Sequence, residues 1–286
     1  MRQELRKTAA RALLAASLAL AGGVLAAQTP AAQYEPMIGQ DGKDVVWVPT
    51  LEIMVEKMLD VARVTPQDFV IDLGSGDGRN VIAAAKRGAR ALGVEFNVDL
   101  VEYSRRMAAA ADVPGRALFV QGDMYAADIS QASVLALFLL TENLGRLVPK
   151  FLDLKPGSRI VTNSYEIPGW TADVSETVRD SCNSFCNVFL YVVPAKAAGA
   201  WRMPEGDLVL EQDFQRLSGT FEIGGARVPI QNGRLNGAEI RFSVNGVEYA
   251  GRIDGDTMEG IAKGGTTSTA WRGTRTTAGV RSDSKA

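Results

Sequence analysis

A glycine-rich loop at residues 70–80, with the sequence VIDLGSGDGRN, is the segment best suited to bind a ligand. It combines acidic and small residues at close spacing: Asp72, Gly74, Ser75, Gly76, Asp77 and Gly78. Glycine leaves the backbone bare, so that a ligand can approach it closely. The carboxylates add negative charge at the same place. We therefore expect this loop to bind a molecule through its main chain and to favour positive charge.

Two nucleotide-like ligands compete for this loop. A dinucleotide fingerprint starting at Gly74 requires a third glycine at position 79, where the chain has Arg79. A pyrophosphate about 4–6 Å from Asp72 or Asp77 would also be repelled by on the order of 1 kcal/mol in a partly desolvated site. The same charges suit S-adenosylmethionine, which carries an ammonium and a sulfonium. The sequence therefore favours S-adenosylmethionine as the cofactor.

Acidic residues also end the next two expected strands. Glu95 ends the second strand, and Asp123 with Met124 follows the third. The carboxyl ends of parallel strands form the binding edge of an open α/β sheet. We expect Glu95 to accept hydrogen bonds from the ribose hydroxyls, Asp123 to bind the adenine amino group and Met124 to pack on the ring. Each residue alone could equally be a strand end, a turn residue or a helix cap.

The elements that must position these residues alternate along the chain from 44 to 194. Expected strands lie at 68–74, 90–96, 116–123, 132–140, 157–165 and 186–194, and expected helices at 49–64, 79–88, 97–111 and 142–151. Asn97 is the predicted N-cap of the third helix. Strands that are apolar on both faces and alternate with helices indicate a parallel sheet covered on both sides. The fold class is therefore α/β.

A second region, residues 205–275, has a different pattern. Short alternating runs are separated by Gly-Gly, Asn-Gly and Asp-Gly pairs, which are the preferred residues of tight hairpin turns. This predicts a small antiparallel β meander or barrel, followed by a disordered tail at 276–286. The region, with Trp201 and Trp271 near its ends, is either a structural cap or a module that recognises a partner protein or a cell-envelope ligand.

Composition removes several function classes. The chain has no histidine, which excludes a Ser-His-Asp triad and every zinc site that uses histidine. The formal net charge is −2, and no basic stripe is visible, so nucleic acid is not expected as the main partner. Cys182 and Cys186 alone cannot complete a tetrahedral metal shell, and no metal site is expected.

The first residues resemble an export signal. Residues 1–27 combine a basic start, an alanine- and leucine-rich run and small residues at a cleavage site. We expect a cleaved signal peptide, an exported, periplasmic protein with no membrane span in the mature form, and a disulfide between Cys182 and Cys186 in an oxidising compartment. The alternative is a cytoplasmic protein whose leader is misread.

Residues 44–194 resemble class I SAM-dependent methyltransferases, and within that class the FAM173-type protein lysine methyltransferases. The matching motifs are VPT (48–50), DLGSGDGRNVIAAAKRG (72–88), GVEFN (93–97), FLLTEN (138–143) and LKPGSRIVTNSYEIPGW (154–170). The resemblance implies a Rossmann-like sheet of seven strands and methyl transfer to a nucleophile, with a lysine amine of a protein as one candidate.

The resemblance also suggests residues for the acceptor side. Thr141, Glu142 and Asn143 are the candidates for catalytic contact with the acceptor. Trp47, Thr50 and Tyr165 are candidate walls of the acceptor pocket, although the two aromatic residues could equally belong to the core. Methyl transfer is an in-line displacement that relies on alignment and exclusion of water, so it suits a chain without histidine. An exported fold that binds a ligand without catalysis is the alternative function.

Overall fold

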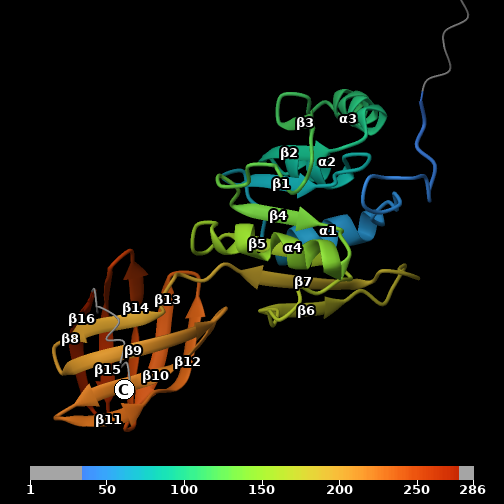
Figure 1. Cartoon of the computed structure of the whole chain (residues 1–286). Coiled ribbons are helices and arrows are strands. Elements are labelled where there is room, and N and C mark those ends of the chain that lie inside the picture. Colours follow the sequence, from blue (N-terminus) through green and yellow to red (C-terminus); the bar gives the residue numbers. More distant parts are fainter. Residues whose placement is uncertain (1–33, 277–286) are drawn as a thin grey trace, which may run out of the picture. The chain divides into compact units, whose positions relative to one another are not determined.

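The structure, a computed structural model, describes residues 34–276 (Figure 1). The predicted signal peptide, 1–27, lies outside the described residues, as does the predicted tail from residue 277 onward. Within residues 34–276, no helix has both the length and the apolar character needed to cross a membrane. The described chain contains a mixed α/β sheet followed by a β-barrel.

A seven-stranded sheet forms the first part, in the order β3-β2-β1-β4-β5-β7-β6. Its strands are β1 Phe69–Leu73, β2 Arg90–Glu95, β3 Ala117–Gln121, β4 Val134–Leu137, β5 Arg159–Asn163, β6 Val174–Thr177 and β7 Asn187–Val192. The first five strands are parallel, as predicted. The prediction of a wholly parallel sheet is wrong at one edge, because β7 pairs antiparallel with both β5 and β6. The strand β6 was not predicted.

Four helices cover both faces of this sheet: α1 Glu52–Val61, α2 Arg79–Lys86, α3 Val98–Ala110 and α4 Thr141–Leu152. Alternate residues of β1 point to opposite faces. Val70 joins a core with α1, α2 and α3, whereas Ile71 and Leu73 join a second core with α4. Asn97 caps α3 as predicted, because its side chain accepts hydrogen bonds from the backbone N–H groups of Asp99 and Leu100.

The barrel contains nine strands: β8 Gly199–Met203, β9 Gly206–Asp213, β10 Arg216–Ile223, β11 Ala226–Pro229, β12 Gln231–Asn236, β13 Glu239–Val244, β14 Val247–Asp254, β15 Thr257–Gly264 and β16 Thr267–Arg275. Neighbours pair antiparallel, and the pairing of β9 with β10 closes eight of these strands into a ring. The β11 strand attaches to β10 outside that ring. The region is therefore a closed barrel, and its first strand begins before the predicted boundary at 205.

Apolar side chains fill the barrel interior, with Phe221, Phe242 and Tyr249 packed ring against ring. Trp201 is 0% exposed and Trp271 is 3% exposed in the same core. Both indoles therefore belong mainly to the barrel core, and the hypothesis that this region is a recognition module stays a prediction. An eight-stranded ring is just wide enough for side chains to fill it, so these two residues stabilise the fold.

Candidate active site

The glycine loop joins β1 to α2 and turns sharply. Its glycines adopt left-handed backbone, with φ of 56° at Gly76 and 82° at Gly78. A Cβ at Gly76 would lie 2.4 Å from the Trp47 indole nitrogen, and one at Gly78 would lie 2.6 Å from the Phe119 ring. Both the backbone conformation and the lack of space therefore require glycine. Side chains of the protein thus pack on Gly76 and Gly78, whereas Gly74 is exposed and lines a cavity at the carboxyl edge of the sheet.

Asp72 lies within β1, directly before this loop. Its side chain is buried, and one carboxylate oxygen accepts a hydrogen bond from the Asn80 amide at 3.1 Å. Burial raises the pKa of the Asp72 carboxyl well above its ordinary value, and the nearby charges of Glu95 and Asp77 act in the same direction. A positive ligand would stabilise the ionised form of Asp72. The electrostatics of the loop therefore fit a cation.

The other loop acid, Asp77, is neutralised by a partner within the chain. The Arg79 guanidinium donates to both of its carboxylate oxygens, and the same guanidinium donates to the backbone carbonyl of Thr50. Thr50 itself is buried. This network ties the start of α2 to the segment that precedes α1. Of the two loop acids, Asp72 is therefore the one without a cationic partner among the described residues.

Glu95 ends β2 and touches the loop. One carboxylate oxygen accepts from the backbone N–H of Gly76 at 2.9 Å, and the other accepts from the N–H of Asn97 at 2.9 Å. A carboxylate has about four lone-pair positions, so two remain free for hydroxyl donors. The predicted role of Glu95 in binding ribose is compatible with this geometry and stays a prediction.

Asp123 follows β3 and lines the cavity at the carboxyl edge of the sheet. One oxygen accepts from the Tyr125 N–H at 2.8 Å, and the other pairs with the Lys43 ammonium at 2.6 Å. The hydrogen bond from Lys43 is the main cause that lowers the pKa of Asp123. The Lys43 ammonium also lies 4.9 Å from the centre of the Phe96 ring. The residue predicted to bind adenine therefore has a cationic partner that the sequence analysis did not identify.

A cavity of about 380 Å³ joins these features. Of the predicted cofactor residues, Gly74, Glu95, Asp123 and Met124 line it. Asp72, Ser75, Gly76 and Asp77 are not among its lining residues. Asp72, Ser75 and Gly76 are buried, and Asp77 is half-buried against Arg79. The glycine cradle, the buried acid and the open carboxylates together fit S-adenosylmethionine.

The other end of the cavity is apolar and aromatic. Phe138 stands at the end of β4, Tyr165 follows β5, and Phe185 lies in the segment before β7; all three line the cavity. Ring centres lie 6.1 Å apart for Phe138 and Tyr165, 5.2 Å for Phe138 and Phe185, and 6.2 Å for Tyr165 and Phe185. We call these three side chains the aromatic wall.

The structure places some of the predicted acceptor residues at the cavity and others away from it. Trp47 and Tyr165 line the cavity, whereas Thr50 does not. Thr141 and Glu142 are exposed at the start of α4. Asn143 is buried and donates to the Tyr125 hydroxyl at 2.7 Å. None of these last three lines the cavity, and their predicted catalytic role stays a prediction.

Sequence reasoning missed Lys43, Phe96, Phe138 and Phe185 in the cavity. Phe138 had a usable signal, because it stands at the carboxyl end of a predicted strand, where the site residues gather. Phe185 had a weaker signal, which is its position between Cys182 and Cys186. Phe96 had the same signal as Phe138, because it ends the expected strand at 90–96, whereas Lys43 had none, because only the fold brings it beside Asp123.

Comparison with known proteins identifies the family. A family model described as the ANTKMT methyltransferase domain matches residues 72–174. A protein-lysine N-methyltransferase from Saccharolobus islandicus (strain REY15A) is 41% identical over 152 residues, which are 52% of this chain and 94% of that protein. The chain belongs to this family of class I SAM-dependent methyltransferases.

Two other proteins are similar to this methyltransferase. The adenine nucleotide translocase lysine N-methyltransferase of Mus musculus is 34% identical over 118 residues, which are 41% of this chain and 51% of that protein. A crystal structure of an RNA methyltransferase from Salinibacter ruber in complex with S-adenosyl-L-homocysteine is 37% identical and covers 52% of this chain and 95% of that chain, with a TM-score of 0.49. The alternative of a fold without catalysis finds no support in the described residues or in these relatives.

S-adenosylmethionine is the cofactor of this methyltransferase, and when bound it supplies the methyl group. The chain supplies position and environment. Gly74 and Glu95 line the cavity at one end, and the aromatic wall lines it at the other. Alignment of two reactants in such a site accounts for much of the rate of a displacement. An apolar surrounding also favours the neutral form of an attacking amine.

Proposed function

We propose that this methyltransferase transfers methyl groups to the side-chain amine of a lysine in a protein acceptor. The observation that carries the proposal is the continuity of one cavity from Gly74 and Glu95 to the aromatic wall. A lysine has an apolar stem that packs on aromatic rings and an amine at its tip. The names of the relatives, two of which are lysine methyltransferases, support the same acceptor class.

The chemistry of the wall supports an amine as the nucleophile. Methyl transfer requires the neutral amine, because an ammonium has no lone pair. A lysine amine has an ordinary pKa of about 10.4, and desolvation beside apolar rings lowers the pKa of such a group. The chain has no histidine to remove the proton. Desolvation by Phe138, Tyr165 and Phe185 takes the place of a strong base in this proposal.

The proposal is tested with the purified protein, S-adenosylmethionine carrying a labelled methyl group, and extracts that contain protein and RNA. We expect the label in protein, recovered after hydrolysis as methylated lysine. Asp123→Ala, which removes a cavity carboxylate, lowers incorporation, whereas Asp153→Ala, on an exposed pair with Lys196, does not. Label recovered in RNA, or in protein on a residue other than lysine, would reject the lysine acceptor.

We also propose that the enzyme works outside the cytoplasm, in the periplasm. The signal-like pattern of residues 1–27 supports this, and so does the disulfide between Cys182 and Cys186, since such bonds persist mainly in oxidising compartments. Cell fractionation followed by mass spectrometry of the N-terminus tests it. We expect a mature chain that starts near residue 28 in the periplasmic fraction. An intact Met1 in the cytoplasmic fraction would contradict the proposal.

A further inference from the structure

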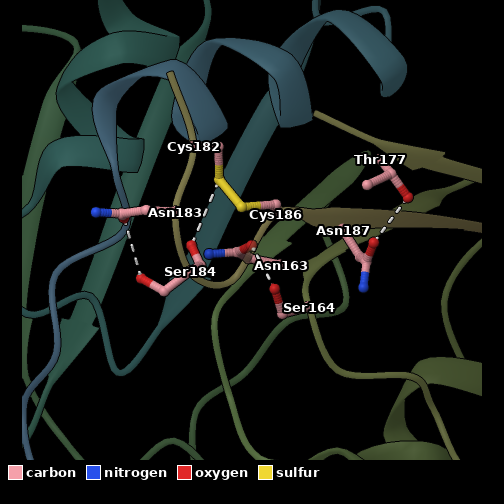
Figure 2. The surroundings of a disulfide bond; sticks show 8 residues. All are labelled: Asn163, Ser164, Thr177, Cys182, Asn183, Ser184, Cys186 and Asn187. Carbon is pink, nitrogen blue, oxygen red and sulfur yellow. Dashed lines mark hydrogen bonds between the residues drawn. A yellow bond between two sulfur atoms is a disulfide. The ribbon is translucent and has the colours of Figure 1, made fainter. Parts of the chain in front are cut away.

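The segment between β6 and β7 contains a disulfide (Figure 2), and Phe185, which lies between the two cysteines, lines the cavity. Cys182 and Cys186 are four residues apart and are bonded, which confirms the predicted pair. The base of the segment is closed by a hydrogen bond from the Val178 N–H to the Cys186 carbonyl at 2.8 Å and by one from the Thr177 hydroxyl to the Asn187 side chain at 2.8 Å. The bond thus locks the tip of a β-hairpin.

This hairpin tip is anchored to the sheet on both sides of the bond. Cys182 packs against the core that contains α1 and α2. On the other side, the Ser164 N–H donates to the Asn187 carbonyl at 2.8 Å, and Figure 2 shows Ser164 and Asn163 beside the bonded segment. Tyr165, a member of the aromatic wall, is the next residue after Ser164. The disulfide and the wall are therefore parts of one local structure.

Phe185 stands inside the disulfide ring in a backbone conformation that a bulky residue rarely adopts. Its φ is 58°, and Ser181, just before the ring, has a φ of 59°. Left-handed backbone is uncommon for residues other than glycine, because the Cβ crowds the following carbonyl oxygen. A short crosslink removes the alternative conformations that the free segment would prefer. The bond thus favours the one arrangement in which Phe185 reaches the cavity.

The side chain held in this way is large, apolar and 40% exposed. It contacts Phe138 edge to face and lines the cavity with Tyr165. It is the one residue of the bonded segment, 182–186, among the cavity-lining residues. Glu95 and Asp123 are the carboxylates predicted to bind the cofactor. They belong to β2 and to the turn after β3, away from the segment between β6 and β7 that contains Phe185. The position of Phe185 therefore concerns the acceptor end of the cavity.

We propose that the Cys182–Cys186 disulfide positions Phe185 as the specificity-determining wall of the acceptor site, so that acceptor binding requires the bond and cofactor binding does not. The proposal rests on the proposed function. With Phe185 in place, the cavity admits a slender unbranched amine such as a lysine side chain. When the bond is open, the tip relaxes away from left-handed backbone, and the wall loses one ring.

The test uses the whole protein, Nα-acetyl-lysine N-methylamide as the acceptor probe and S-adenosylhomocysteine as the cofactor probe. In the Cys182→Ser/Cys186→Ser variant we expect the KM for the lysine probe to rise at least fivefold. The Kd for S-adenosylhomocysteine, measured by calorimetry, should stay within twofold. Phe185→Ala should give the same pattern, and Phe185→Tyr should restore the acceptor KM. Ile261→Ala, at 41% exposure on the barrel, is the matched control and should change neither constant.

A double-mutant cycle distinguishes positioning from a general loss of structure. If the bond acts through Phe185, adding Phe185→Ala to the double serine variant raises the acceptor KM no further. Additive effects, or a serine variant with an unchanged acceptor KM, would overturn the proposal. If the serine variant folds poorly, dithiothreitol replaces it: the reagent gives two electrons and two protons to the bond, leaves two thiols and becomes its own cyclic disulfide.

The proposed function and this inference fail in different ways. Equilibrium binding of the same lysine probe to the S-adenosylhomocysteine complex, measured by saturation-transfer NMR, does not depend on catalysis. Binding that requires the disulfide, without any methyl transfer to lysine, would reject the proposed function and keep the inference. Methyl transfer to lysine that is equal in the oxidised and reduced protein would reject the inference and keep the proposed function.

Discussion

The two ends of β1 carry aspartates in opposite electrostatic states. Asp68, just before the strand, accepts hydrogen bonds from the Ser133 hydroxyl at 2.7 Å and the Thr65 N–H at 2.8 Å, and it pairs with Arg159. Asp72, near the other end, has a single side-chain donor, Asn80. Both carboxyls are buried. The two aspartates therefore differ in their partners, and Asp72 is also the more deeply buried of the two.

The pKa values of the two groups follow these partners. Burial acts to raise the pKa of Asp68, but the bonds from Ser133 and Thr65 and the charge of Arg159 outweigh it, so the pKa is lowered. For Asp72, burial dominates, and the pKa is raised. A buried acid that the chain satisfies is part of the fold, whereas one left partly unsatisfied at a binding edge is available to a ligand. We therefore expect the amino end of the strand to contribute stability and the carboxyl end to contribute to cofactor binding.

The largest expected effect is at Asp68. Asp68→Ala leaves the Arg159 guanidinium and the Ser133 hydroxyl without their partner, and we expect a loss of about 3 kcal/mol in the free energy of unfolding. Urea denaturation at pH 7 measures it. Asp153→Ala, whose pair with Lys196 is exposed at both ends, is the control and should cost less than about 1 kcal/mol. Equal losses of unfolding free energy in Asp68→Ala and Asp153→Ala would show that Asp68 stabilises the protein no more than an exposed ion pair does. The proposed difference between the two ends of β1 would then fail.

The pH dependence of this loss has a definite sign. The folded-state pKa of Asp68 is lowered, so its contribution is complete above the unfolded value of about 3.9 and disappears as the pH falls through the folded pKa. The stability difference between the native protein and Asp68→Ala should therefore shrink only on the acid side of about pH 4. A difference that shrinks on the alkaline side instead would contradict the assignment.

Asp72→Asn should have the opposite effect on stability and a functional cost. Replacement of a buried carboxyl with a raised pKa by a neutral amide is expected to stabilise the unliganded protein by about 1 kcal/mol at pH 7, because the amide ionises in neither the folded nor the unfolded state. Loss of the carboxylate charge should weaken S-adenosylmethionine binding by about tenfold, or 1.4 kcal/mol. Thermal unfolding and calorimetric titration measure the two effects. Asp99→Asn, an exposed acid at the start of α3, is the control and should change neither.

The pH profile separates Asp72 from Asp68. The folded pKa of Asp72 is raised, so the folded state holds its proton over a wider range than the unfolded chain. Its presence should lower stability progressively as the pH rises from about 4 through the folded pKa. The stability gained by Asp72→Asn should thus grow with pH in that window. A gain that is constant with pH would show that the carboxyl is not protonated there.

The parallel part of the fold was readable from the sequence because its signals are local. The run 69–73 is mostly apolar and is followed by Gly74, and Asn97 provides its own capping oxygen. The antiparallel edge was not readable, because the direction of β7 is set by its partners. The strand β6 is short, polar and mostly exposed, so it lacks the alternation that marks a half-buried strand.

The barrel and the site show the same limit. The run 208–217 contains no Gly-Gly, Asn-Gly or Asp-Gly pair, yet it belongs to two strands that turn at Phe214, whose φ of 50° no sequence pattern predicts. Glu95 and Asp123 were found because strand ends gather at one edge. Lys43 was not, because it is 80 residues from Asp123 in the chain and meets it only in the folded protein. Local chemistry was predictable, and long-range pairing was not.

The pair of Lys43 and Asp123 gives the smallest expected effect. Both groups lie near the surface, so their mutual attraction is weak. If Asp123 binds the adenine amino group, the Lys43 ammonium competes with that amino group for the Asp123 carboxylate. Lys43→Met should therefore tighten S-adenosylhomocysteine binding by about two- to threefold, or roughly 0.5 kcal/mol. Calorimetric titration at low salt measures the change, with the exposed Lys155→Met as the control.

Binding measured at increasing salt concentration tests whether the effect of Lys43 is electrostatic. A charge pair at this exposure is screened at high ionic strength, since the Debye length falls from about 10 Å at 0.1 M to about 3 Å at 1 M. The advantage of Lys43→Met should therefore shrink as salt is added. If the variant binds S-adenosylhomocysteine more weakly than the native protein, Lys43 closes the cavity over the cofactor instead of competing with it. The carboxyl edge would then hold an acid that, like Asp68, already has its partner.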